Sequence, residues 1–278
     1  MILFPNCKIN IGLQILGKRP DGFHDLETLF YPVPLQDALE IVSHPSEETQ
    51  VTVTGMNIDV RKEDNICYKA WSVLRKDFPA IPPVKIHLHK RIPAGAGLGG
   101  GSADGAFTLL LLNKKYGLKL NETQLFQYAL QLGSDCPFFI RNRPSFATGR
   151  GEELQDLSLD LSGYEIMVVN PGIHINTAEA FRGIIPSSER PSLKELVTRP
   201  IAEWKGQVQN DFEVSVFRDY PEIEAIREQL YNSGAVYASM TGTGSTVYGF
   251  YKKGDTPKLS FPDHYFIKLV KAAEALIG

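Results

Sequence analysis

The segment with the clearest potential for chemistry runs from Pro93 to Asp104 and holds five glycines in twelve residues. Glycine lets backbone N–H groups approach a ligand closely and adopts positive φ at little steric cost. An apolar run from Gly105 to Tyr116 follows and predicts a helix, with Ser102 as its N-cap. A helix N-terminus offers unpaired donors and a partial positive charge. The sequence therefore predicts an anion site here, most commonly for a phosphate.

Other glycine-rich phosphate motifs fit this segment less well. Gly95-x-Gly97-x-x-Gly100 matches the dinucleotide fingerprint, which needs an acidic residue about 20 positions later at the end of a strand. Glu122 lies at that distance, but it follows Asn121 at a predicted helix start. The chain lacks the Gly-Lys-Ser/Thr of a Walker loop and the His-Arg-Asp and Asp-Phe-Gly of protein kinases. A phosphate loop of different design is predicted, and a plain surface turn is the alternative.

Two ionisable residues stand in positions that suggest a catalytic role. Lys8 opens the run Lys8–Ile15, whose alternation of polar and apolar residues predicts a strand with Lys8 and Asn10 on one face, away from the core. Asn121 and Gln124 predict a capping box at the start of a helix through Leu132, which Gly133 should end and Pro137 should keep from resuming. Asp135 follows this helix and precedes an apolar run. A carboxylate flanked so closely by apolar sequence is positioned rather than merely solvated. A purely structural Lys–Asp ion pair is the alternative interpretation.

The remaining elements predict a mixed α/β protein. Helices are expected to begin at Asn176 and Pro221, and the stretch Pro186–Pro200, rich in proline, serine and charge, is predicted as a surface excursion. Thr241–Ser245 lies between two apolar strands and is predicted as a plain hairpin turn or as a second loop of backbone donors, and both can hold together. The predicted strands are 38–43, 50–54, 84–90, 164–169, 235–240 and 246–251.

Composition sets the broad class. With 278 residues, 43% hydrophobic and 22% charged, the chain is predicted to be globular with one large or two modest domains. A net charge of −3 gives no reason to expect a nucleic-acid partner, and no apolar run reaches the ~20 residues of a membrane helix. We expect no signal peptide, because the first residues lack a basic region followed by a long apolar core. The three cysteines predict free packing thiols in a reducing compartment. The expected location is the cytoplasm.

Three separated segments, Lys8–Ile11, Pro93–Asp104 and Met240–Gly244, together resemble the motifs of the GHMP kinases (galactokinase, homoserine, mevalonate and phosphomevalonate kinases). Their order and separation match, so the resemblance spans almost the whole chain. It implies an α/β (α+β) two-domain GHMP kinase fold. An N-terminal ATP-binding domain like ribosomal protein S5 domain 2 would cover residues 1–160, and a ferredoxin-like C-terminal domain residues 161–278.

Three further segments resemble one branch of this superfamily, which acts on 4-diphosphocytidyl-2-C-methyl-D-erythritol in the non-mevalonate route to isoprenoids: Arg19–Thr28, Glu63–Ala70 and Leu132–Phe139. This resemblance implies transfer of the ATP γ-phosphoryl group to the 2-hydroxyl of that small molecule, with Mg²⁺, by a monomer or weak homodimer. The alternatives are a homoserine or mevalonate type of kinase and a non-catalytic GHMP-fold binding protein. Phe23-His24 argues against the first, and the presence of Lys8 and Asp135 argues against the second.

The resemblance also assigns residues. It gives catalysis to Lys8 and Asp135, and it makes Ser102 the better Mg²⁺ candidate, because Ala103 and Gly105 stand where the family has serine and alanine. The residues implied for the substrate are Asn10, Phe23 (a tyrosine in the family pattern), His24, Phe30, Gly242, Thr243 and Gly244. Those implied for ATP are Pro93, Ala94, Gly95, Ala96, Gly97, Leu98, Gly99, Gly100, Gly101, Ser102, Ala103, Asn65 and Lys90.

Overall fold

The computed structural model describes residues 1–44, 47–58, 60–255 and 257–272, and the chain folds into two compact units. The first unit consists of residues 1–7, 35–94 and 99–142, and the second of residues 8–34, 95–98 and the chain from Arg143 onward. Neither unit is continuous in sequence. The glycine-rich segment itself is shared, since residues 95–98 belong to the second unit and their flanks to the first.

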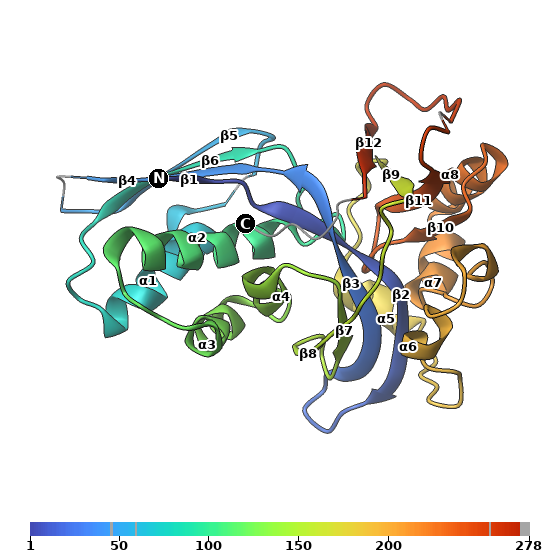
Figure 1. Cartoon of the computed structure of the whole chain (residues 1–278), viewed down its shortest axis with the longest axis horizontal. Helices are drawn as coiled ribbons and strands as arrows, with labels where there is room; N and C mark the ends of the chain where they lie inside the picture. The colour runs from blue at the N-terminus through green and yellow to red at the C-terminus, as the bar shows by residue number, and fades with distance from the viewer. Residues whose placement is uncertain (45–46, 59, 256, 273–278) are drawn as a thin grey trace. The chain divides into compact units, whose positions relative to one another are not determined.

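The first unit is one four-stranded sheet with its helices on one face (Figure 1). Its strand order is β1 (Ile2–Leu3), β4 (Ala38–Ser43), β6 (Val84–Lys90), β5 (Gln50–Gly55), with β5 and β6 parallel. In β6 the apolar residues alternate with exposed or half-exposed ones, which buries one face. The buried face packs against apolar residues of α1 (Ile66–Asp77), α2 (Gly100–Tyr116) and α3 (Glu122–Leu132). A short helix, α4 (Cys136–Arg141), and a 3₁₀ turn (Lys62–Asp64) complete the unit.

Helix α2 begins five residues earlier than the sequence predicts, and the expected cap is wrong. Its N-cap is Gly99 in the left-handed conformation, without a side-chain cap, so Ser102 lies inside the first turn. The reason is packing: a Cβ at Gly100 would lie 2.8 Å from Cγ2 of Ile92, so only glycine permits this close approach. The central part of α2 is buried, as its apolar composition predicts.

The next two helices are set by local sequence. Asn121 and Gln124 form the predicted reciprocal capping box at the start of α3, and Gly133 is its C-cap. The prediction that Pro137 prevents further helix is wrong, because α4 begins at Cys136 and proline is tolerated in a first helical turn. Asp135 therefore stands immediately before a short helix, with backbone angles of φ −84° and ψ −16°.

The second unit contains two antiparallel sheets (Figure 1). The first has the order β2 (Asn6–Lys18), β3 (His24–Gln36), β7 (Ser145–Thr148), β8 (Glu153–Asp156). The second has the order β10 (Tyr237–Met240), β11 (Val247–Lys252), β9 (Tyr164–Asn170), β12 (Phe266–Lys271). Helices α5 (Thr177–Arg182), α7 (Phe212–Asp219) and α8 (Pro221–Asn232) supply apolar residues to a core shared with these strands, and Ile201–Glu203 form a 3₁₀ turn. The helix starts predicted at Asn176 and Pro221 and the hairpin around residues 241–246 are confirmed.

Strand β2 departs from its predicted pattern in burial. Lys8 is only 3% exposed and Asn10 only 2%, so the polar face of β2 is covered as well as the apolar one. The prediction that these side chains point away from the core is therefore corrected: the face that bears them is polar, but it is buried. A buried polar side chain needs hydrogen-bond partners, which makes the surroundings of Lys8 and Asn10 a buried polar network.

The predicted surface excursion at residues 186–200 is also wrong in part. Residues Leu193–Leu196 form a short helix, α6, whose two leucines are buried. Leu193 fills the space beside Gly12, where a Cβ would lie 2.7 Å from its Cδ2 atom. The carboxylate of Glu27 accepts hydrogen bonds from the Leu193 N–H and the Ser192 hydroxyl, at 2.6 and 3.0 Å. The polar composition of this stretch does not indicate that α6 packs against the rest of the unit, because that packing depends on contacts with residues far away in sequence.

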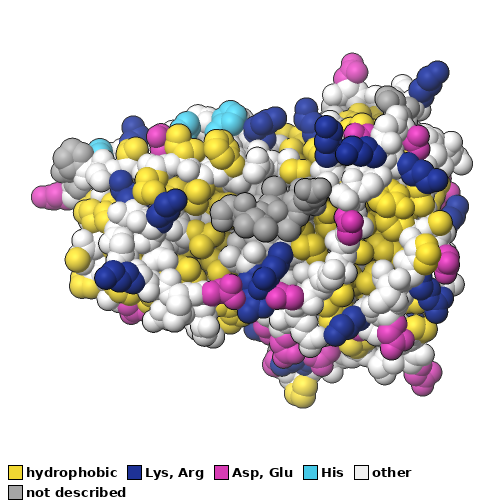
Figure 2. All heavy atoms as spheres, in the orientation of Figure 1, with side chains coloured by type: hydrophobic (Ala, Val, Ile, Leu, Met, Phe, Trp, Pro, Cys, Tyr) yellow, Lys and Arg dark blue, Asp and Glu magenta, His cyan; other side chains and the backbone are white. Residues whose placement is uncertain are grey.

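Charged side chains of both signs are interspersed over the face seen in Figure 2, without a continuous basic stripe. Within the part of the chain that the structure describes, no helix has both the length and the apolar character needed to cross a bilayer. The three cysteines are buried and form no disulfide. Burial raises the pKa of the Cys67 thiol, and it raises the pKa of Cys136 to about 12, which agrees with packing thiols rather than nucleophiles.

Candidate active site

Within the second unit, three separated segments meet through hydrogen bonds: the start of β2, the glycines around Gly97, and the loop after β10. The Lys8 N–H donates to the Leu98 carbonyl at 2.9 Å. The Asn10 N–H donates to the Thr241 hydroxyl at 2.9 Å, and that hydroxyl lies 3.0 Å from the Gly97 carbonyl. Residues 8–10, 97–98 and 241 therefore form one junction, which we call the three-loop junction.

Position 97 of the junction requires glycine. Its φ is +78°, a conformation that residues with a Cβ rarely adopt. A Cβ at this position would collide with the backbone carbonyl of Thr241, which has no freedom to rotate away. The glycine at 97 is thus required both by its own conformation and by the contact with the loop after β10.

The side chains of Lys8 and Asn10 share one face of β2, as predicted. The Lys8 ammonium donates to Oδ1 of Asn10 and lies 4.8 Å from the ring centroid of Phe30. Asn10 Nδ2 donates to the Thr28 hydroxyl at 3.0 Å. The Tyr248 hydroxyl donates to the Asn10 carbonyl at 2.9 Å, and burial holds the pKa of Tyr248 well above its ordinary value, so this donor keeps its proton. The structure thus brings together Lys8, Asn10 and Phe30.

The loop after β10 contains the predicted residues Gly242, Thr243 and Gly244, and a buried amide supports it. Nδ2 of Asn210 donates to the carbonyls of Met240 and Gly242, both at 2.8 Å, and its Oδ1 accepts from the Phe212 N–H at 3.0 Å. Sequence reasoning missed Asn210 and the hydroxyl of Thr241. The one signal in the sequence is that Asn210 directly precedes Asp211, an acidic residue at the start of a helix.

The turn before His24 is fixed by charge. Arg19 contacts Asp21 at 3.1 Å and Asp25 at 2.8 Å. A hydrogen bond from the Phe23 N–H and the contact with Arg19 hold the pKa of Asp21 below its ordinary value. The turn therefore presents Phe23 and His24 in a defined position.

Two of the predicted aromatic residues lie at the start of β3: Phe23 directly precedes the strand, and His24 is its first residue. Phe23 is 55% exposed, with the guanidinium of Arg150 5.0 Å from its ring centroid. His24 stacks on Phe181 with ring centroids 4.6 Å apart and planes 16° from parallel. Phe181 was missed as a site residue, since the sequence shows only that it belongs to a helix.

In the first unit, Asp135 is half-buried at the start of α4, and its side chain does not cap that helix. Cys136, the next residue, is fully buried, and burial raises the pKa of its thiol. A hydrogen bond with the Ser102 side chain lowers this pKa and so partly offsets the effect of burial. Ser102 in the first turn of α2 and Asp135 before α4 are thus connected through Cys136. Lys8 belongs to the second unit.

The two residues implied for the adenine have structural partners in the first unit. Asn65 is the N-cap of α1 and accepts from the Cys67 N–H at 2.9 Å. The Lys90 ammonium is buried and bonded to the carboxylates of Asp37 and Asp104. Desolvation, opposed by Lys90, raises the pKa of Asp104 to about 7. Any contact of Lys90 with a base would therefore come from its backbone.

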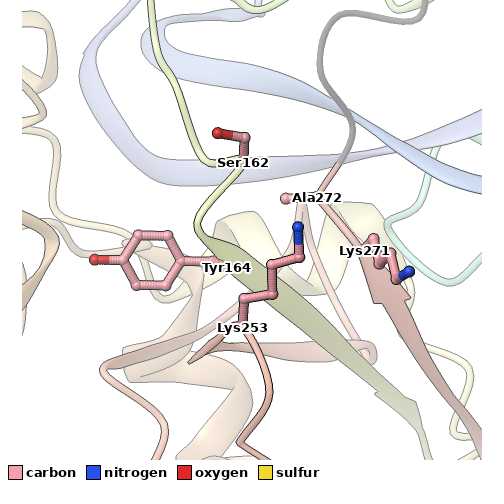
Figure 3. Close-up of a pocket in the computed structure, with 5 residues that line it drawn as sticks. All are labelled: Ser162, Tyr164, Lys253, Lys271 and Ala272. Carbon is pink, nitrogen blue, oxygen red and sulfur yellow. The ribbon is translucent and has the colours of Figure 1, made fainter.

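A hollow of about 290 Å³ lies at the edge of the second sheet of the second unit (Figure 3). Figure 3 shows Lys253 extending between Tyr164 and Ala272, with Ser162 and Lys271 completing the lining. None of the predicted site residues lines it. The three-loop junction, which joins the predicted segments, is the better candidate for the chemistry.

Comparison with known proteins agrees with this geometry. The family model described as GHMP kinases N terminal domain matches residues 65–143, and the one described as GHMP kinases C terminal matches residues 192–259. A homoserine kinase structure from Cytophaga hutchinsonii, 16% identical with a TM-score of 0.63 over 90% of this chain and 85% of that one, shares the fold. The predicted α/β GHMP kinase fold is confirmed.

Relatives of higher identity narrow the assignment to a small-molecule kinase. A Bacteroides thetaiotaomicron protein named 4-diphosphocytidyl-2-C-methyl-D-erythritol kinase is 49% identical over 96% of this chain and 98% of its own. A Chlorobium limicola protein of the same name is 41% identical over 89% and 87%. A crystal structure of 4-(cytidine 5′-diphospho)-2C-methyl-D-erythritol kinase is 32% identical, with a TM-score of 0.73 over 90% of this chain and 89% of that one. The chain therefore belongs to the GHMP kinase family and, within it, to the 4-diphosphocytidyl-2-C-methyl-D-erythritol kinases.

Proposed function

We propose that this kinase transfers the γ-phosphoryl group of ATP to the 2-hydroxyl of 4-diphosphocytidyl-2-C-methyl-D-erythritol, in the formation of isoprenoid precursors. The observation that carries the proposal is the three-loop junction, in which hydrogen bonds join the three segments that resemble GHMP kinase motifs. Phosphoryl transfer depends mainly on positioning and on charge stabilisation. A junction that fixes a glycine loop against an ammonium-bearing strand suits that requirement.

Residues Pro93–Ala103 are proposed to hold the phosphates of ATP. Gly95, Gly97 and Gly99 all have positive φ, and α2 starts at Gly100. Alternating left-handed glycines turn successive N–H groups toward one side, and the helix N-terminus adds its own donors. Gly242–Gly244 are proposed to contact the acceptor through backbone N–H groups, and Asn65 and Lys90 to border the adenine.

Asp135 is proposed to accept the proton of the attacking hydroxyl, as a general base in reach of that group does. Lys8 is proposed to stabilise the negative charge that develops on the acceptor oxygen and the transferring group. Two features support these roles. The Asp135 side chain is not consumed in capping α4, and the Lys8 ammonium is held by Asn10 in a site shielded from water.

Mg²⁺ is proposed to accompany ATP. Among the described residues, no group of three or more His, Cys, Asp or Glu side chains is arranged to hold a metal ion. In kinases Mg²⁺ keeps several waters and binds largely through substrate phosphates, so it needs few protein ligands. Ser102, in the first turn of α2, is the proposed protein ligand. When bound, the ion neutralises charge on the phosphates.

The cytidyl group is proposed to lie against Phe23 and His24, with Asn10 and Phe30 farther along the site. We expect Phe23→Ala and His24→Ala each to raise the KM for the cytidyl substrate about tenfold, because stacking of a base on an aromatic ring contributes about 1–3 kcal/mol. The KM for ATP should stay within about twofold. Steady-state kinetics with each substrate varied in turn provide the measurement.

Phe4→Ala is the matched control for the Phe23 variant, because both rings are 55% exposed and only Phe23 is assigned to the pocket. Phe4→Ala should change neither KM. Equal increases in both KM values for the Phe23 and His24 variants would contradict the pocket assignment.

The proposed reaction is tested by coupling ADP formation to NADH oxidation with different acceptor alcohols. We expect turnover with the cytidyl substrate at least about 10³-fold above that with mevalonate or homoserine, since a pocket built for a base rejects acceptors that lack one. Turnover with mevalonate or homoserine instead would establish a sister activity. ATP binding without turnover of any acceptor would establish a binding protein.

We also propose that the enzyme acts in the cytoplasm as a monomer or weak homodimer, with its small-molecule substrates as partners and without nucleic acid or membrane. The net charge of −3 and the buried cysteines, which form no disulfide, support this proposal. Light scattering of the purified protein would measure its oligomeric state.

A further inference from the structure

Three charged side chains form a buried ionic cluster in the first unit, and none of these side chains has a role in the chemistry described so far. It consists of Asp37, Lys90 and Asp104, which are 1%, 3% and 2% exposed, and we call it the Asp–Lys–Asp cluster. The Lys90 ammonium donates to Oδ2 of Asp37 and to Oδ2 of Asp104, the latter at 2.8 Å. The three residues come from the start of β4, the end of β6 and the second turn of α2.

The cluster ties both ends of the glycine loop together. Lys90 is the last residue of β6, and Oδ1 of Asp37 accepts from the N–H groups of Arg91 and Ile92, the latter at 2.9 Å. The chain that leaves β6 toward the glycines is thus held by Asp37. Asp104 lies in α2, which the chain enters on the other side of the loop, and Lys90 connects the two.

The end of β6 and the start of α2 are in close contact. A Cβ on Gly100 would lie 2.8 Å from Ile92 and 3.5 Å from the Lys90 ammonium nitrogen. The start of α2 therefore rests directly on the end of β6, so a shift of Lys90 would move the first turn of the helix. The backbone donors of that turn are the ones proposed to face the phosphates.

Stability alone does not account for this cluster. It has two carboxylates for one ammonium, and within the described residues Oδ1 of Asp104 is buried without a hydrogen-bond partner. Buried ion pairs contribute little net stability because desolvation opposes their attraction, and an unsatisfied buried oxygen is unfavourable. What such a cluster does supply is a directional arrangement that apolar packing would not specify.

We propose that the side chains of the Asp–Lys–Asp cluster are a positioning device that sets the geometry of the phosphate loop and thereby the affinity for ATP, without themselves touching ATP. The proposal rests on the proposed role of residues 93–103 in ATP binding. Asp37 is the central residue of the cluster. It alone contacts both the Lys90 ammonium and the backbone N–H groups of Arg91 and Ile92, which lead into the loop. Asp104 anchors α2 to the same ammonium through one oxygen only.

This difference gives a matched pair of variants. In Asp37→Asn, the amide NH₂ must face either the Lys90 ammonium or the N–H groups of Arg91 and Ile92, so neither orientation satisfies all partners. In Asp104→Asn, the amide oxygen can face Lys90 while the NH₂ takes the place of the unpaired oxygen. The two variants make the same chemical change, from a carboxyl to an amide, yet only the first disrupts the geometry.

Affinity for a non-hydrolysable ATP analogue with Mg²⁺ is measured by calorimetry on the full chain, well below the unfolding temperature. We expect Asp37→Asn to weaken binding at least about tenfold and to speed amide hydrogen exchange in residues 93–103. The affinity of Asp104→Asn for the ATP analogue should remain within about threefold of that of the unchanged protein. The KM for the cytidyl substrate should stay within about twofold in both, whereas a purely structural role would lower the unfolding temperature and leave ATP affinity unchanged.

A folded Asp37→Asn variant with unaltered ATP affinity would overturn the proposal. Equal losses of affinity in both variants would also overturn it, because the contacts that only Asp37 makes would then have no special role. If Asp37→Asn does not fold, Lys90→Arg takes its place. It keeps the charge but has a larger head group against Gly100, so ATP affinity should again fall at least about fivefold, and unchanged affinity would overturn the proposal. Failure of the unchanged protein to bind the ATP analogue would instead contradict the proposed function.

Discussion

Replacing Asp135 with asparagine is expected to lower kcat by about 10²–10⁴-fold, the usual contribution of a general base. The amide has the same shape but accepts no proton from the acceptor hydroxyl. Because the Asp135 side chain does not cap α4, the fold should survive, and the thermal unfolding midpoint should shift by no more than a few degrees. The KM for ATP should change little. Steady-state kinetics and circular dichroism on the same preparation give the measurements.

The control for this variant is Asp77→Asn in the same unit. Asp77 is a carboxylate on α1 that accepts a hydrogen bond from Tyr128 at 2.6 Å, and its replacement should leave kcat unaffected. Near-normal kcat in Asp135→Asn would remove Asp135 from the proposed mechanism.

Lys8→Met extends the same test to the second proposed catalytic residue. If Lys8 and Asp135 serve one acceptor hydroxyl, the double variant should be scarcely slower than the slower single variant, because groups that act as a unit give strongly non-additive losses. Independent roles would make the two losses multiply. The double-mutant cycle in kcat therefore measures whether the two residues act together.

Gly97→Ala is expected to lower kcat/KM for ATP at least about 100-fold and to destabilise the second unit. Alanine at φ +78° is strained, by about 1–3 kcal/mol for such a conformation, and its Cβ would collide with the Thr241 carbonyl. Relief of the collision requires Thr241 to move, which breaks its hydrogen bonds to Asn10 and Gly97. The three-loop junction would then open at its centre.

The matched control is Gly163→Ala, where no heavy atom lies within 4 Å of an added Cβ and φ is not positive. It should change stability by no more than about 0.5 kcal/mol, as surface substitutions usually do, and leave kinetics unaffected. Denaturant unfolding and ATP-dependent kinetics distinguish the two. If Gly97→Ala bound ATP and turned over normally, the close approach of the two loops would have no part in function.

Local features of the fold could be predicted from the sequence because their energetics are local. The capping box at Asn121 and Gln124 involves residues three positions apart, and the β10–β11 hairpin joins neighbouring segments. The start of α2 could not be predicted in this way. Ser102 is a good cap by type, but the contact of Gly100 with Ile92 places the helix start earlier.

The residues of the candidate site likewise fall into those that the sequence predicted and those that depend on contacts between distant segments. Residue types and their order predicted the glycine loop, Lys8, Asn10 and the loop at 242–244, and family resemblance gave them roles. Sequence gave no sign that Asn210 supports the loop after β10, that Phe181 stacks on His24, or that Asp37 holds the chain beyond β6. Each of these contacts joins positions far apart in the chain, and many other pairings would be equally compatible with the composition.

By itself, the sequence determined the motifs, the short-range caps and turns, and membership in a kinase family, because these depend on residue identity and on neighbours within a few positions. Only the tertiary structure decided that the polar face of β2 is buried and that Thr241 bridges Asn10 and Gly97. It also decided that two buried carboxylates share Lys90. The physical reason is that burial and hydrogen-bond pairing belong to the packed chain, in which distant segments exclude water from one another.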